Sequence, residues 1–204
     1  MATATAFTVL LVVGVIVSTL QAIRASRAEV SSLAQTSFLK SILGSINPSI
    51  ARGRDTALLR DVLDKSATRI DKELANQPGV QADMFLTIGA TYLNLGEYTN
   101  ALAMTQQALR LLQAYFGPKS IAAAHALNDL GVIYSEMGDL TNAIAYDRQA
   151  LEMKKALLGN EDADVATSMS NVGFRLWNLG EYAESEAMHR EALRIRRKLL
   201  DKND

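Results

Sequence analysis

Apolar residues recur along most of the chain at the spacing of amphipathic helices, and from Ala82 onward the pattern repeats every 42 residues. The repeated units are residues 82–123, 124–165 and 166–204. They contain in turn the strings IGATYLNLGEYTNALAMTQQAL, LGVIYSEMGDLTNAIAYDRQAL and VGFRLWNLGEYAESEAMHREAL. Three similar segments in one register predict an array of equivalent helical units.

Small residues occupy equivalent positions in all three units. Two glycines, an alanine and a leucine recur in register: Gly89, Gly131 and Gly173; Gly96, Gly138 and Gly180; Ala108, Ala150 and Ala192; Leu109, Leu151 and Leu193. We expect the first glycine and the alanine to lie where the two helices of a hairpin approach closely, because a larger side chain would push the backbones apart. The second glycine is expected to end the first helix in a left-handed conformation. The pattern predicts a repeated helix–turn–helix unit, with Tyr92, Tyr134 and Leu176 filling the gaps between hairpins.

Upstream of the repeats, residues 55–80 predict an unpaired helix that covers the N-terminal end of the array. Asp55-Thr56 is suited to an N-cap, and the helix should run to about Ala75. Its apolar face has helical spacing and consists of Leu58, Leu59, Val62, Leu63, Ala67, Ile70 and Leu74. The sequence Asn76-Gln77-Pro78-Gly79 then breaks the helix. Before it, residues 25–54 are expected to form a helix over Glu29–Leu43 and a loop over Gly44–Arg54.

Residues 1–24 predict a transmembrane helix. No charged side chain occurs from Ala2 to Ile23, and these 22 residues reach about 33 Å as a helix, enough to cross a bilayer core of roughly 30 Å. The Leu, Ile, Val and Phe residues contribute about −3 to −6 kcal/mol to insertion. A signal peptide cleaved near Ser26-Arg27-Ala28 and a buried core helix are the alternatives, but the segment lacks the basic start of a signal peptide.

The orientation of this span follows from the charges beside it. Arg24 and Arg27 follow the span, so the positive-inside rule places the repeats on the cytoplasmic side if Met1 is the native start. We therefore expect a single-pass membrane protein.

Composition excludes several classes of function. The 21 Lys and Arg residues nearly balance the 22 Asp and Glu residues, whereas a nucleic-acid-binding protein needs a basic excess. The chain has no cysteine, which excludes disulfides, thiol catalysis and iron–sulfur clusters. No carboxylate pair, nucleophile–base set or metal cluster stands out from the helical pattern, so we expect neither enzyme activity nor a cofactor.

From about Gln81 to Leu200 the repeats resemble the tetratricopeptide-repeat family in its 42-residue form, the type found in kinesin light chains. The resemblance implies an all-α solenoid that binds proteins or peptides. One departure stands midway along each second helix, where the family has a bulky aromatic residue and this chain has Thr105, Asp147 and His189.

In stacked helical hairpins the first helix of each repeat lines a concave groove. By helical phase, the residues that face it are Asp83, Leu86, Thr87, Asn94, His125, Asn128, Asp129, Val132, Glu136, Ser170, Asn171, Phe174, Trp177 and Asn178. The resemblance to kinesin-light-chain repeats implies that Asn128, Asp129 and Asn171 can hydrogen-bond a peptide backbone. Phe174 and Trp177 are candidate anchors for a partner, since exposed aromatic residues mark interfaces. The alternative is that the polar residues are merely solvated and that the aromatic residues pack against a neighbouring helix.

A second resemblance covers nearly the whole chain. The string STLQAIRASRAE at Ser18–Glu29, FLKSILGSINPSIARG from Phe38 and LLRDVLDKSATRIDKELANQPGVQA from Leu58 resemble the region after the kinase domain in bacterial serine/threonine kinases with C-terminal repeat arrays. Kinase motifs themselves are absent from this sequence. Two hypotheses follow: a membrane-anchored scaffold, or the sensory or docking half of such a kinase in signal transduction.

The last predicted hairpin has no further helix to cover it within this sequence. Each repeat of a solenoid buries its apolar face only against its neighbours. We therefore expect residues 166–200 to fray or to stack on a second copy, through Trp177, Leu193, Ile195 and Leu199.

Overall fold

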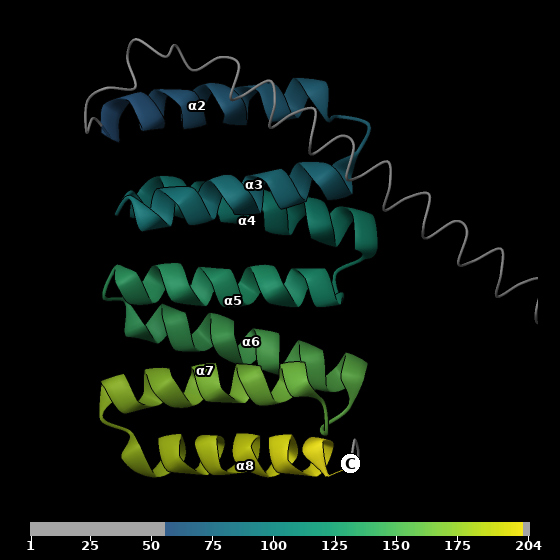
Figure 1. The fold of residues 1–204 in the computed structure, drawn as a ribbon, viewed down its shortest axis with the longest axis vertical. Helices are drawn as coiled ribbons and strands as arrows, with labels where there is room; N and C mark the ends of the chain where they lie inside the picture. Colours follow the sequence, from purple (N-terminus) through teal and green to yellow (C-terminus); the bar gives the residue numbers. More distant parts are fainter. Residues whose placement is uncertain (1–55, 202–204) are drawn as a thin grey trace, which may run out of the picture. The chain divides into compact units, whose positions relative to one another are not determined.

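The computed structural model describes residues 56–201, apart from the side chains of Thr56 and Leu58. This range consists of α-helices and contains no strand. The helices are α2 (Thr56–Glu73), α3 (Pro78–Asn94), α4 (Tyr98–Phe116), α5 (Ile121–Glu136), α6 (Leu140–Leu158), α7 (Ala163–Leu179) and α8 (Tyr182–Leu200). Figure 1 shows α2 followed by three stacked hairpins, α3–α4, α5–α6 and α7–α8. The unit boundaries drawn from the sequence at Ala82, Ala124 and Ala166 fall near the N-terminal ends of α3, α5 and α7.

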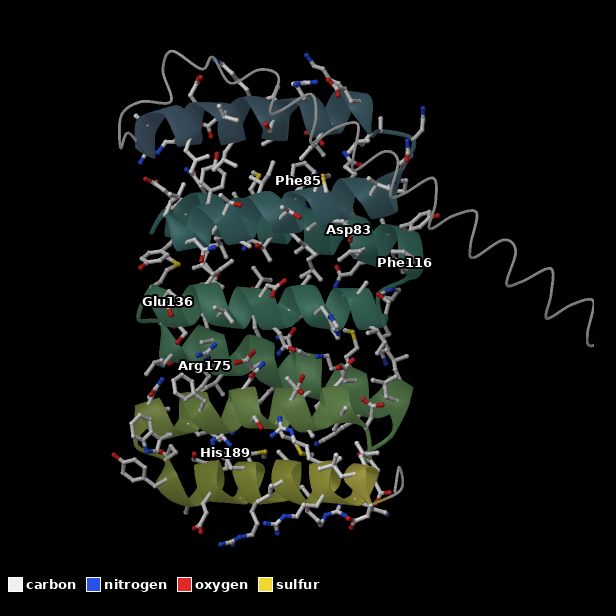
Figure 2. All side chains as sticks on the ribbon, viewed as in Figure 1. Asp83, Phe85, Phe116, Glu136, Arg175 and His189 are labelled. Atoms are coloured by element: carbon white, nitrogen blue, oxygen red, sulfur yellow. The ribbon has the colours of Figure 1, made fainter. Side chains whose placement is uncertain are left out.

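The first glycine of each repeat lies where the two helices of a hairpin meet. A Cβ added at Gly89 would lie 2.8 Å from Thr105 Oγ1, and one at Gly131 would lie 2.8 Å from Asp147 Cγ. At Gly173 the same atom would lie 2.9 Å from His189 Nε2. Thr105, Asp147 and His189 are the residues that replace the family's aromatic side chain. Each packs on the glycine of its own hairpin, and His189 is seen between α7 and α8 (Figure 2).

The other small residues of the repeat have the predicted roles. Ala108, Ala150 and Ala192 are fully buried. Gly138, which follows the C-cap residue Met137 of α5, has φ +82°, a left-handed conformation that residues with a Cβ adopt only at a cost. Gly96 and Gly180 have positive φ at the equivalent positions, so each first helix turns sharply into the second.

Helix α2 packs against α3, the first helix of the three hairpins. Val62, Leu63, Ile70 and Leu74 are buried, and the Tyr92 hydroxyl of α3 donates a hydrogen bond to Asp64 of α2. Phe85, also buried, points from α3 toward α2 (Figure 2).

The prediction that Leu59 belongs to the apolar face of α2 is wrong, because its side chain is 39% exposed. The neighbouring Arg60 pairs with Glu97, which lies in the turn after α3.

The outer face of α8 is more polar than the sequence suggested. Ile195, expected at an exposed apolar surface, is fully buried in the core between the last two hairpins, and Leu199 packs against this core. Helical phase directs exposed Arg190, Arg194 and Arg197 outward instead, together with half-exposed Leu193. A charged outer face of this kind is compatible with water.

No helix within residues 56–201 is long and apolar enough to cross a membrane. The predicted transmembrane segment Ala2–Ile23, the helix at Glu29–Leu43 and the loop at Gly44–Arg54 lie outside the described residues.

The close contact at Gly131 predicts a specific sensitivity to side-chain size. Gly131→Leu should destabilise the protein by about 1–3 kcal/mol, because the added atoms meet Asp147 and the carbonyl of Ala143. Gln149→Leu, at an exposed position of α6, is the matched control and should change stability far less. Thermal unfolding followed by circular dichroism measures both variants. Equal melting temperatures would contradict the packing described for the hairpin.

Candidate partner-binding face

The first helices of the three hairpins, α3, α5 and α7, run in the same direction through the stack (Figure 1). Their sequences are in register every 42 residues, so equivalent side chains form rows across the three helices. One set of these side chains is partly or fully exposed, and we call it the first-helix face: Asp83, Thr87, Ala90, Asn94, His125, Asp129, Val132, Glu136, Thr167, Asn171, Phe174, Trp177 and Asn178. Asp83 lies toward one end of the helices and Glu136 at the other (Figure 2).

A small pocket of about 100 Å³ opens between α3 and α5 beside this face. Its lining is mainly apolar and consists of Leu86, Ala90, Leu93, Thr105, Asp129, Val132 and Ile133. Asp129 contributes the charged group. The pocket partly shields this carboxyl from water, and the resulting desolvation raises its pKa, although His125 and Lys154 act in the opposite direction.

Acidic side chains dominate the charge of the first helices. Asp83, Asp129 and Glu136 are exposed, and Asp164 in the first turn of α7 is half-buried. Desolvation raises the pKa of the Asp83 carboxyl as well. Across α3, α5 and α7 there is no lysine, and Arg175 is the single arginine. Arg175 is buried, so the first-helix face presents carboxylates without an exposed arginine or lysine.

Two aromatic side chains lie on this face at the C-terminal end of α7. Phe174 is 48% exposed and Trp177 is 58% exposed. Their rings stack with centroids 6.5 Å apart and planes 20° from parallel. They are the third-repeat equivalents of Ala90 and Leu93, which line the pocket on α3. The aromatic pair therefore extends the surface on which the pocket opens.

A network of buried polar side chains lies behind the face, between the second and third hairpins. Asn128 is its centre: its amide nitrogen donates to Asp147 Oδ1 at 3.0 Å. Its amide oxygen accepts hydrogen bonds from Lys154 Nζ at 3.0 Å and from Ser168 Oγ at 3.1 Å. Side chains of α5, α6 and α7 are thereby joined.

Asp147 and Arg175 form the charged pair of this network. Arg175 Nε lies 3.3 Å from Asp147 Oδ2, and the Asp147 side chain is fully buried. Figure 2 shows Arg175 between α6 and α7. Desolvation raises the pKa of the Asp147 carboxyl, outweighing the influence of Asn128 and Arg175, and it lowers the pKa of the Lys154 ammonium.

Two family models, both described as Tetratricopeptide repeat, match residues 80–156 and 165–204, together more than half of the chain. The chain is a tetratricopeptide-repeat protein. No curated protein matches it.

Solved structures share the fold of this tetratricopeptide-repeat protein at low sequence identity. BtubC (BKLC) from P. vanneervenii has a TM-score of 0.60 and 22% identity over 85% of this chain and 74% of its own. A protein described as a kinesin light chain with nearly identical TPR-like repeats, from Podosopora anserina, has a TM-score of 0.57 and 13% identity over 87% of this chain and 90% of its own. MamA has a TM-score of 0.50 and 18% identity over 71% of each chain. These similarities show the solenoid fold.

Most of the residues expected in the groove lie on the exposed surface of the first helices. They include Thr87, Asn94, His125, Asp129, Glu136, Phe174, Trp177 and Asn178, with Leu86, Val132, Ser170 and Asn171 half-buried. Some of them also make internal contacts: the Thr87 hydroxyl donates to the Asp83 carbonyl, and His125 Nε2 lies 3.6 Å from Asp164 Oδ2.

The expectation that Asn128 faces the groove is wrong. Asn128 is 9% exposed, and its amide is bonded to Asp147, Lys154 and Ser168 inside the solenoid. The physical reason is the position of α6: Asn128 lies beside Leu127 and one turn before Gly131, on the side of α5 that α6 covers.

The charged members of the network were not expected from the sequence. A signal was present, however, because Asp147 and Lys154 are seven residues apart on one face of α6. Ala143, Ala150 and Leu151 of the same helix are buried. Two charges at helical spacing within an apolar stripe indicate a buried pair. Among the residues that the structure describes, no group of three or more His, Cys, Asp or Glu side chains is arranged to hold a metal ion.

The neighbours Asn128 and Asp129 give a matched test of this arrangement. Asn128→Leu should lower the free energy of unfolding by about 2–3 kcal/mol, because it removes hydrogen-bond partners from buried Lys154 and Asp147. Asp129→Asn should change it by no more than about 0.5 kcal/mol, because Asp129 is exposed. Urea unfolding measures both values. A larger loss for Asp129→Asn than for Asn128→Leu would reverse the inward and outward sides assigned to α5.

Proposed function

We propose that this tetratricopeptide-repeat protein is a membrane-anchored scaffold, without catalytic activity, that binds a protein or peptide partner on its first-helix face. The observation that carries the proposal is the exposed, stacked pair Phe174 and Trp177 beside polar rows of the same helices. Large aromatic side chains contribute most of the binding energy at protein interfaces, and leaving both in water has a cost. A solenoid presents such a face as an extended binding surface.

The polar residues of the face suit an extended peptide. Asn94 and Asn178 are exposed and Asn171 is half-buried at the equivalent surface of α3 and α7. A primary amide donates to a carbonyl and accepts from an N–H group, so it can pair with a peptide backbone whatever its side chains. Binding of this kind tolerates variation in the partner's sequence.

The proposed anchor is the uncharged segment Ala2–Ile23. Its length and apolar content support a single membrane span, and Arg24 and Arg27 favour a cytoplasmic position for the repeats. Attachment to a membrane concentrates the binding face on a surface, which suits a protein that recruits partners. The same concentration favours pairing of two copies, for which Trp177 and the exposed Leu193 offer apolar contacts.

A second proposal is that the chain is the sensory or docking half of a bacterial serine/threonine kinase. It is supported by the strings that begin at Ser18, Phe38 and Leu58, which resemble the region after the kinase domain in members of that family with C-terminal repeat arrays. The genomic sequence directly upstream of Met1 distinguishes the two proposals. An in-frame kinase domain there favours the second.

Capture of the partner tests the scaffold proposal. The full chain, expressed in its own host, is cross-linked to its neighbours in intact membranes, and the neighbours are identified by mass spectrometry. A separate sample of the same membranes is washed with carbonate. Replacing Phe174 and Trp177 by Ala should reduce capture of the specific partner at least about tenfold, because each anchor contributes roughly 2 kcal/mol or more. The control replaces Arg190 and Arg194 on the outer face of α8 by Ala and should leave capture unchanged.

Two results would contradict the proposal. One is loss of the chain from membranes during the carbonate wash, which would show that the chain is not anchored by a membrane span. The other is an identical set of captured proteins for the wild type and the Phe174/Trp177 variant, which would show that the first-helix face is not the binding surface.

A further inference from the structure

The distribution of charge on the solenoid is uneven. Exposed carboxylates of the first helices belong to Asp83, Asp129 and Glu136, whereas the single arginine of these helices is buried against Asp147. Over the described range, exposed arginines and lysines lie on other helices, for example Arg110 on α4, Arg148 on α6 and the arginines of α8. The first-helix face is therefore a negative surface. It attracts cations and repels phosphates and acidic segments.

The pocket between α3 and α5 adds a shape requirement. Its volume of about 100 Å³ is well below the roughly 300–1,000 Å³ of small-molecule sites, so it suits one side chain and not a free ligand. Leu86, Leu93 and Val132 give it apolar walls, and Asp129 gives it a carboxylate. Lysine and arginine have a methylene stem that buries in apolar surroundings and a charged end that needs an anion. A purely apolar side chain would cover the Asp129 carboxylate without giving it a partner.

The carboxyl groups themselves favour a cation. Desolvation by neighbouring protein atoms raises the pKa values of the Asp83 and Asp129 carboxyls, so their ionised forms are incompletely solvated although both residues are exposed. A bound cation would stabilise these ionised forms. The nearby Lys154 ammonium already donates to Asn128, and His125 lies beside Asp164.

The aromatic pair defines a second contact at a limited distance. Phe174 and Trp177 lie on α7, the first helix of the next hairpin after α5. Helices in direct contact pack about 8–10 Å apart, and α6 packs against both α5 and α7, so α5 and α7 are separated by at most about two such steps. An extended chain advances about 3.3 Å per residue. The pocket and the aromatic pair are thus about three to six residues apart along an extended peptide.

We infer that the partner binds through a cationic extended segment, which places a Lys or Arg side chain in the pocket against Asp129 and an apolar or aromatic side chain on Phe174 and Trp177. The inference rests on the proposed function, because it specifies the partner of the same face. Asp129 acts as the residue that selects charge, and the aromatic pair supplies the apolar contact. Asp83 and Glu136 extend the negative surface toward the two ends of the helices (Figure 2).

An unbiased peptide library tests the inference and does not require the partner to be identified first. Displayed random peptides of about ten residues, long enough to cross the three first helices when extended, are selected on the full chain held in lipid nanodiscs. We expect enrichment of Lys or Arg at one position and of an apolar or aromatic residue about three to six positions away. Raising the salt concentration should weaken the selected peptides.

Charge variants connect the selection to Asp129. Asp129→Asn should weaken the selected peptides at least about tenfold, and Asp129→Lys should shift the enriched residue to Asp or Glu. Glu186→Lys, a charge reversal at an exposed position of α8, is the matched control and should change neither result. Thermal melting of each variant checks that the solenoid remains folded, and the conservative Asp129→Asn gives the decisive measurement if the lysine variant does not fold.

The outcomes separate the inference from the function on which it rests. Peptides that require Phe174 and Trp177 but lack a basic residue, or whose affinity is the same for Asp129→Asn, would overturn the inference and leave the scaffold proposal standing. Enrichment of acidic peptides would overturn it as well. A selection in which no peptide depends on Phe174 and Trp177 would contradict both.

Discussion

Each hairpin of this protein depends on a contact in which the first helix contributes no side chain. At Gly89, Gly131 and Gly173 a single added carbon would meet atoms of the second helix closer than van der Waals contact allows. Because this contact recurs every 42 residues, the hairpins have the same geometry, and their first helices run in parallel. The rows of exposed residues on α3, α5 and α7 are a consequence of that repetition.

In the second hairpin the residue opposite Gly131 is the carboxylate Asp147. This carboxylate pairs with Arg175 of α7 and so takes part in the contact with the third hairpin. Asp147 is fully buried and needs Asn128 and Arg175, while Asn128 also holds Lys154 and Ser168. Buried charges contribute little net stability, but removing one partner is costly because the other remains desolvated. The network therefore fixes how α7 lies against α5 and α6. It also keeps Arg175, the only arginine of α3, α5 and α7, buried, and the exposed charges of the first-helix face are therefore acidic.

Periodicity accounts for what could be predicted from the sequence. The three hairpins, the left-handed glycines and most of the buried face of α2 follow from local spacing, which the fold repeats without change. Leu59, Asn128 and Ile195 were predicted wrongly because helical phase does not show where a neighbouring helix lies or which of two adjacent positions it covers. The pocket and the network could not be predicted, since their residues come from several helices. The pair Asp147 and Lys154 was the one local indication of the network.

A bound partner is expected to cover the first-helix face and not the outer face of α8. The chain has no cysteine, so a single thiol can be introduced on either surface without background. The rate of thiol labelling should be measured for Asn178→Cys on α7 and Arg190→Cys on α8, before and after the partner binds. Binding is expected to slow labelling at position 178 several-fold and to leave labelling at position 190 unchanged. Protection at position 190 with free labelling at position 178 would show that the partner covers the outer face of α8 instead.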